Sequence, residues 1–156
     1  MERFTGTVEE LCAVDVSSII EWVTAIPFEE WPQQHPVNGQ LRPAMVKDLM
    51  WHGLASAVAP ALDAVQVGGR VSNVLLTVVM PGQGIDEHVD YQPDHWLARI
   101  HVPLTTNEES QFIVGGEHHH MNVGSAYLVN TTVEHAVRND GDTPRIHLMW
   151  DILSSA

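Results

Sequence analysis

The chain has 156 residues, of which 44% are hydrophobic, and it carries 20 acidic residues against 7 Lys and Arg, a formal net charge of −13. This length fits one domain that buries a real core, so we expect residues 1–156 to form a single domain. An acidic surface repels nucleic-acid phosphates and anionic lipids, which argues against nucleic acid or a membrane as the main partner.

The chain has a single cysteine, Cys12, which excludes an intramolecular disulfide and has the apolar neighbours of a small buried residue. The N-terminus lacks the basic and apolar segments of a signal peptide, and no apolar run approaches the roughly 20 residues that cross a bilayer. We therefore expect a cytoplasmic protein. No feature of the sequence indicates an oligomeric state.

Residues 1–70 are predicted to be a helical and loop region that packs on a β-rich body. Apolar residues at helical spacing predict a helix over 14–25, and four prolines predict an ordered loop or arm over 27–43. A second helix is expected over 44–63, with Pro60 interrupting it late.

From residue 70 onward the sequence becomes typical of β-structure. Short apolar or alternating runs separated by Gly, Asn and Asp predict strands over residues 70–80, 97–104, 110–117, 125–130, 134–139 and 145–153. Many short, closely spaced strands indicate an antiparallel sandwich or barrel.

Two of these strands carry cations on one face. In "LARIHVPL" Arg99 and His101 lie opposite an apolar face, and in "RIHLMWDIL" Arg145 and His147 do the same. An arginine on a buried strand requires an anion, for which a bidentate carboxylate is well suited. Pairing of each arginine with a rim carboxylate remains the alternative for either one alone.

His88, Asp90 and His135 are the candidate metal ligands. Residues two apart on an extended segment point to the same side, so His88 and Asp90 lie together, and His135 follows on a later strand. Two imidazoles and a carboxylate form the facial triad of non-haem Fe(II) enzymes, whereas a closed zinc site needs four ligands and usually cysteine. Because the chain has 10 histidines, this spacing also arises by chance.

A family resemblance joins these features. The ordered segments "EHVDY", "LARIHVPLTTN", "FIVGG" and "NVGSAYLVNTTVEHAVRNDGDTPRIHLMWDI" resemble the aspartyl/asparaginyl β-hydroxylase-like family over residues 71–153. The resemblance implies a double-stranded β-helix, which is a jelly-roll, cupin-like fold. It also implies an Fe(II)- and 2-oxoglutarate-dependent dioxygenase that uses O2, hydroxylates a C–H bond and releases succinate and CO2.

The resemblance assigns roles to individual residues. His88, Asp90 and His135 match the metal ligands, and no catalytic residue is expected beyond the metal centre. Three further residues match the binding site of 2-oxoglutarate: Arg145 at its distal carboxylate, Thr77 near that carboxylate, and His101 near the other carboxylate. Some relatives lack the carboxylate ligand, and relatives carry acidic residues where this chain has Asn130.

Arg99 matches an arginine that can meet an acidic substrate, and His147 is a pocket candidate because it shares the face of Arg145. The expected substrate is therefore a small, carboxylate-bearing molecule, such as an amino acid or a peptide residue. Two alternatives remain: a cupin-like metal-dependent dioxygenase or isomerase that uses no 2-oxoglutarate, for which Arg145 would not be needed, and a non-catalytic binding domain.

Two other histidine segments have simpler interpretations. His118, His119 and His120 cannot all reach one ion from a strand, so we expect exposed strand residues, with lining of the substrate mouth as the alternative. His95 lies either on a lid over the metal or, as we favour, on a turn that packs Trp96 against the barrel.

Overall fold

The computed structural model of the protein describes residues 1–27, 44–48 and 54–155. Its helices and strands are, in chain order, β1 Val8–Ala13, α1 Ser17–Thr24, β2 Ala44–Asp48, α2 Leu54–Ala64, β3 Arg70–Val79, β4 Gln83–His88, β5 Trp96–Thr105, β6 Ser110–Val114, β7 Glu117–His119, β8 Ser125–Val129, β9 His135–Asn139 and β10 Arg145–Leu153.

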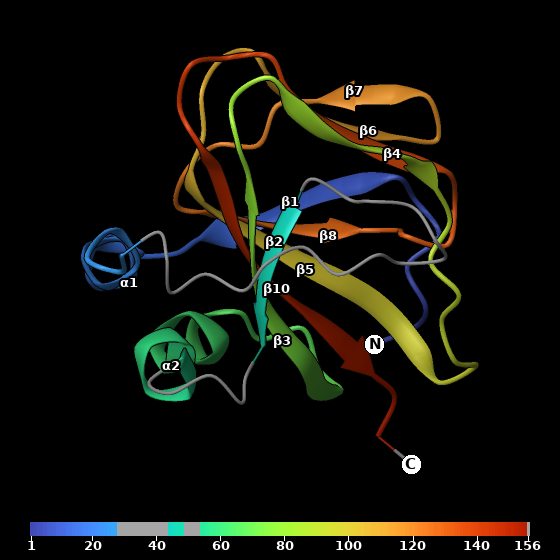
Figure 1. The fold of residues 1–156 in the computed structure, drawn as a ribbon. Coiled ribbons are helices and arrows are strands. Elements are labelled where there is room, and N and C mark those ends of the chain that lie inside the picture. The colour runs from blue at the N-terminus through green and yellow to red at the C-terminus, as the bar shows by residue number, and fades with distance from the viewer. Residues whose placement is uncertain (28–43, 49–53, 156) are drawn as a thin grey trace.

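The strands form two antiparallel sheets. The larger sheet has the order β1-β8-β5-β10-β3-β2, and the smaller sheet has the order β4-β9-β6-β7. Strands that are distant in sequence are neighbours in both sheets, and the chain crosses from one sheet to the other several times (Figure 1). This is the double-stranded β-helix that the sequence predicted.

Apolar side chains gather in two layers, one on each face of the larger sheet. The first layer packs the helices against the outer face of that sheet, where Ile19 and Val23 of α1 meet the same cluster as Leu148 and Trp150 of β10. Figure 1 shows both helices on the side of this sheet that faces away from β6 and β7. The second, smaller layer lies between the two sheets and contains Phe112. The interior between the sheets thus has room for polar groups.

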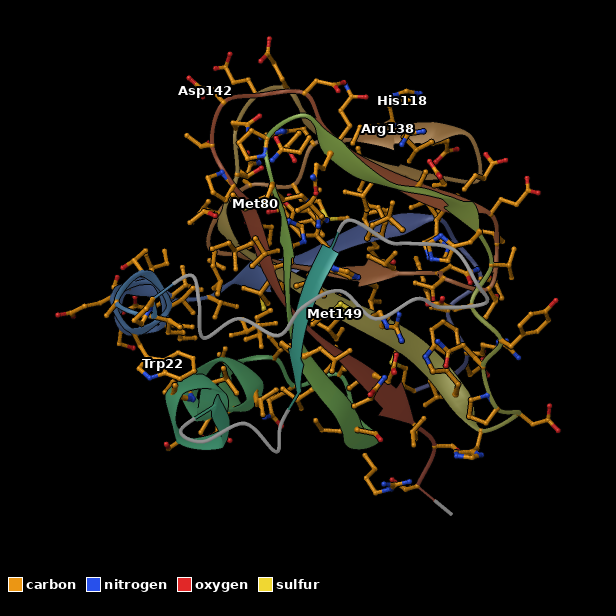
Figure 2. All side chains as sticks on the ribbon, in the orientation of Figure 1. Trp22, Met80, His118, Arg138, Asp142 and Met149 are labelled. Atoms are coloured by element: carbon orange, nitrogen blue, oxygen red, sulfur yellow. The ribbon has the colours of Figure 1, made fainter. Side chains whose placement is uncertain are left out.

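The alternation in β5 and β10 places the predicted side chains on the faces expected. Ile100 and Val102 belong to the apolar layer under the helices, so Arg99 and His101 point between the sheets. On β10, Met149 lies opposite His101 of β5 and points the same way. Figure 2 shows Met149 in the interior of the molecule.

The prediction for residues 1–70 as only helix and loop is wrong in two places. Residues 8–13 form β1, which pairs with β8 at the sheet edge, and residues 44–48 form β2, which pairs with β3. In β1 the register shifts between Glu10 and Cys12, and this irregularity destroys the alternation by which a strand is recognised.

The helix expected over 44–63 exists only as α2, which continues through Pro60. The apolar residues at the start of this segment have helical spacing, but residues 44–48 pair with the edge of β3 and so form a strand. The helix expected over 14–25 is confirmed in shorter form as α1. Nearly all of the predicted 27–43 loop lies outside the described residues. Neither described helix is long and apolar enough to span a bilayer.

Candidate metal centre and anion pocket

The structure brings His88, Asp90 and His135 together between the two sheets. One ligand atom from each lies within 4.8 Å of the other two. The imidazole rings of His88 and His135 are 4.2 Å apart between centroids, and Nε2 of His88 is 3.6 Å from Oδ1 of Asp90. His135 is buried, while His88 and Asp90 are partly exposed, so the cluster opens to solvent on one side.

Strand pairing places these three residues. His88 ends β4 and His135 begins β9, and the two are direct partners in the antiparallel ladder. The chain leaves β4 after His88, and the backbone N–H of Asp90 donates to the carbonyl of Thr131, 2.9 Å away. This bond fixes the loop so that Asp90 returns to the two histidines.

Hydrogen bonds orient both imidazole rings for metal binding. Nδ1 of His88 lies 2.7 Å from the carbonyl oxygen of Asp86, and Nδ1 of His135 lies 2.9 Å from that of Val133. A carbonyl only accepts, so each Nδ1 donates and each Nε2 keeps its lone pair. Burial lowers the pKa of His135, and the nearby His88 lowers it further, which keeps the ring neutral as a ligand must be.

Arg99 holds the third ligand. Its Nη1 donates to Oδ2 of Asp90 at 2.6 Å, while its Nε and Nη2 donate to the two oxygens of Asp151 at 2.9 and 3.0 Å. Burial alone would lower the pKa of Arg99, but its bonds to Asp151 and Asp90 raise it overall. Three of the five N–H groups of Arg99 thus bind carboxylates of the protein, and its expected role at an acidic substrate stays a prediction.

Arg145 has the opposite environment. It is 3% exposed, and no carboxylate of the described residues lies within ion-pair distance. Its Nη2 donates a hydrogen bond to Nδ1 of His147, at 3.1 Å, and its guanidinium carbon lies over the face of the Phe112 ring, 5.5 Å from the centroid. Burial lowers the pKa of Arg145 from its usual value to about 9. A buried guanidinium without an anion is costly and indicates an anionic ligand.

His101 and His147 lie between the two ends of the site, which are Arg145 and the cluster of His88, Asp90 and His135. Arg145 only donates, so Nδ1 of His147 accepts, and this nitrogen is also 3.3 Å from Nδ1 of His101. Burial lowers the pKa of both histidines well below the usual value, and the charge of Arg145 lowers it further. Both rings are therefore neutral at pH 7. Phe112 packs between the ends, with its ring centroid 6.1 Å from that of His135.

A narrow recess opens beside Arg145. Its lining residues are Thr106, Ser110, Gln111, Phe112, His119, Met121, Arg145 and His147. Three buried side-chain atoms in the described part of the chain lack a hydrogen-bond partner: Oγ of Ser110, Nε2 of His119 and Nε2 of His101. The first two line this recess with Arg145. For His119 the contact with Glu117, at 3.6 Å, exceeds hydrogen-bond length. Buried polar groups in folded proteins are nearly always hydrogen-bonded, so these two atoms indicate a missing polar partner.

The remaining predicted residues have simpler surroundings. Thr77 is buried on β3 as the direct partner of His147, on the side of the sheet that faces the site. His118 is exposed, and Figure 2 shows it at the rim near Arg138, whereas His119 is half-buried and lines the recess. His95 is exposed on a turn, and Trp96 after it is fully buried, as the turn interpretation expected. Asn130 accepts two bonds from Thr132 within a turn.

Sequence reasoning missed Ser110 and Asp151 as members of the site, and it gave a place for His119 at the substrate mouth only as the alternative to an exposed strand residue. Asp151 shares the strand face of Arg145 and His147, so the alternation of β10 contained the signal. For Ser110 and His119 no local pattern exists, because β6 and β7 meet β10 only through the packing of the two sheets.

Comparison with known proteins identifies the family. The profile of Aspartyl/Asparaginyl beta-hydroxylase matches residues 51–155. The chain belongs to this family. It is also 32% identical over 90 residues to human aspartate beta-hydroxylase domain-containing protein 2, a match that covers 55% of this chain and 24% of that protein. The chain therefore spans about a quarter of the length of this curated relative.

Solved structures agree on the fold of this family member. A viral collagen prolyl hydroxylase of Paramecium bursaria Chlorella virus-1, in complex with 2OG, superposes with a TM-score of 0.68 at 14% identity, covering 96% of this chain and 97% of that one. A Pseudomonas putida prolyl-4-hydroxylase gives the same score and identity, with coverages of 97% and 95%. A 2OG-Fe(II) oxygenase-family protein of Burkholderia pseudomallei also scores 0.68 at 14% identity, over 94% of this chain and 84% of that one. These likenesses confirm the double-stranded β-helix.

Proposed function

We propose that the protein is an Fe(II)- and 2-oxoglutarate-dependent hydroxylase that adds an oxygen atom from O2 to a C–H bond, with release of succinate and CO2. Membership of a β-hydroxylase family supports the reaction class. The observation that carries the proposal is Arg145, a buried cation with no carboxylate partner among the described residues. It lies on the larger sheet, while His88 and His135 of the metal cluster come from the smaller sheet.

The donor set fits Fe(II). Two imidazoles and one carboxylate occupy one face of an octahedral ion and leave room for a chelating co-substrate and O2. His88, Asp90 and His135 would hold the ion. When bound, iron supplies the activation of O2, and the protein supplies binding, orientation and exclusion of water. A zinc enzyme can use the same donors, but it has no need of a buried arginine beside them.

The recess supplies the binding site for the distal carboxylate of 2-oxoglutarate. The guanidinium of Arg145 pairs with the carboxylate, and Oγ of Ser110 and Nε2 of His119 complete its hydrogen bonds. His147 accepts from Arg145 and so fixes the orientation of the guanidinium. Nε2 of His101 is the atom we expect near the other end of the co-substrate, and Thr77 adds a hydroxyl on β3.

The substrate remains a proposal at the level of class. The two prolyl hydroxylases carry their peptide-residue substrate in their names, and we propose an amino acid or a peptide residue here. Recognition of a substrate carboxylate by Arg99 is not part of the proposal, because Asp151 and Asp90 already bind three of its five N–H groups. The cytoplasmic location expected from the sequence stays a prediction.

Anaerobic binding of 2-oxoglutarate tests the proposal. Purified protein with Fe(II) should develop the metal-to-ligand charge-transfer band of a chelated 2-oxoglutarate, and Arg145→Met should weaken 2-oxoglutarate binding far more than Fe(II) binding. Arg138→Met is the matched control, because it removes an exposed arginine of β9. Absence of the band in the wild-type protein would exclude the 2-oxoglutarate chemistry and favour a cupin-like enzyme or a binding domain. Under air, mass spectrometry across amino acids and peptides should find a product heavier by one oxygen.

A further inference from the structure

The carboxylate of Asp151 is buried and fully hydrogen-bonded. Asp151 is 4% exposed. Its Oδ1 accepts from Nε of Arg99 at 2.9 Å and from Nε1 of Trp96 at 3.0 Å. Its Oδ2 accepts from Nη2 of Arg99 at 3.0 Å and from Nδ2 of Asn73 at 2.9 Å. An ionised carboxylate has about four acceptor positions, and all are occupied here, so the side chain is held in one orientation.

The backbone of β3 is shaped to supply one of these donors. Asn73 has φ of 53°, and the register between β3 and β10 shifts between Met149 and Asp151. A positive φ is unfavourable for most residues, although Asn tolerates it better than most. A bulge of this kind redirects a side chain, and the side chain of Asn73 points to Asp151.

Asp151 in turn fixes Arg99, and Arg99 fixes Asp90. A guanidinium is planar and rigid, so the two bonds from Nε and Nη2 to Asp151 also determine the position of Nη1. That nitrogen donates to Oδ2 of Asp90 at 2.6 Å. The other oxygen, Oδ1, is the one 3.6 Å from Nε2 of His88. Oδ2 of Asp90 is thus bound by Arg99 and lies 3.9 Å from Nε2 of His135, while Oδ1 faces His88 and has no donor among the described residues.

We propose that Asp151 and Arg99 are positioning residues that hold Asp90 to bind the metal through Oδ1 alone. This inference rests on the proposed function. It has an electrostatic part as well: Asp90, Arg99 and Asp151 together carry one negative charge, which favours a divalent cation. Without Asp151, the charge of Arg99 would cancel that of Asp90, and the arginine would compete with the metal for the carboxylate.

Co(II) binding by the full chain, without 2-oxoglutarate, tests the inference. Co(II) stands in for Fe(II) and reports its ligand geometry by its visible absorption. Asp151→Asn should weaken Co(II) binding about ten- to hundredfold, the usual effect of removing an outer hydrogen-bond partner of a metal ligand, and should change the visible spectrum. The titration is performed at a temperature where circular dichroism shows the variant fully folded.

Two milder variants test the same inference if Asp151→Asn does not fold. Asn73→Gly keeps the backbone conformation that a positive φ requires while removing the amide donor to Asp151. Trp96→Phe removes the indole donor and keeps an aromatic ring. Each should weaken Co(II) binding by about threefold or more, since each loosens one support of a metal ligand. The control is Arg138→Gln, which breaks the exposed pair with Asp86 and should stay within about twofold of wild type.

The outcomes separate this inference from the proposed function. If the wild-type protein binds no Co(II), the metal site itself is absent and both proposals fail. If wild type binds Co(II) and Asp151→Asn binds it equally well despite lower thermal stability, Asp151 is only structural and the positioning role is wrong. Should Asp151→Asn not fold, the two milder variants decide by the same comparison with Arg138→Gln.

Discussion

Replacement of Arg145 by Met should make the ligand-free protein more stable while abolishing its response to 2-oxoglutarate. Met keeps an unbranched, flexible stem against Phe112 but removes the charge. Burial lowers the pKa of Arg145 to about 9, a shift that corresponds to about 5 kcal/mol of unfavourable free energy for the charged group. Both folded and unfolded states carry the proton at pH 7, so this whole cost is present there.

Part of that gain is offset when the guanidinium leaves. The bond to His147 is lost, which costs about 1.5 to 3 kcal/mol for a charged donor, so a net stabilisation of about 2 to 3.5 kcal/mol remains. For a domain of this length, that raises the melting temperature by about 4–14 °C. Wild-type protein should instead gain about 2.7 kcal/mol from 2-oxoglutarate at a hundred times its Kd, with a redox-inert metal such as Mn(II) present.

Thermal unfolding followed by circular dichroism, with and without 2-oxoglutarate and Mn(II), measures both effects. The expected pattern is a higher melting temperature for ligand-free Arg145→Met and no further rise with 2-oxoglutarate. A lower melting temperature combined with a wild-type response to the ligand would refute the view that Arg145 is an uncompensated cation awaiting an anion.

Three further predictions use the same site. His135→Ala should abolish Fe(II) or Co(II) binding in a metal titration, and a variant that bound metal as wild type does would remove His135 from the ligand set. Ser110→Ala should weaken 2-oxoglutarate binding about fivefold, in line with about 1 kcal/mol for one hydrogen bond, without changing metal affinity. Burial lowers the pKa of His101 and His147, so below pH 6.5 the unfolded state binds more protons than the folded state. The metal-free protein should therefore lose stability as the pH falls, by up to about 1.4 kcal/mol per pH unit for each histidine. In urea unfolding series at pH 5–7, His147→Gln should reduce the dependence of stability on pH by the contribution of one histidine. An unchanged dependence would contradict the conclusion that buried His147 stays neutral.

Most strands of the β-rich part could be predicted from the sequence because they have regular patterns. The exceptions are β4, which was not predicted, and the single strand expected over 110–117, which is the pair β6 and β7. In β5 and β10 polar and apolar residues alternate, so the faces that carry Arg99 and Arg145 follow from the period of two alone. β1 and β2 escaped prediction because both are edge strands, and β1 has a bulge in place of alternation. The helix expected over 44–63 was too long for a different reason: a short apolar run fits the period of a helix and that of a strand.

The sequence by itself determined which residues could hold a metal and which strand faces would carry charge, since side-chain chemistry and the pleat of a strand are local properties. Only the tertiary structure decided what each charge meets. Arg99 and Arg145 have the same signal in the sequence, yet β10 places Asp151 beside Arg99, while β6 and β7 place a hydroxyl and an imidazole beside Arg145. One arginine is therefore neutralised by the protein and supports a ligand of the metal, and the other is left for an anion from outside.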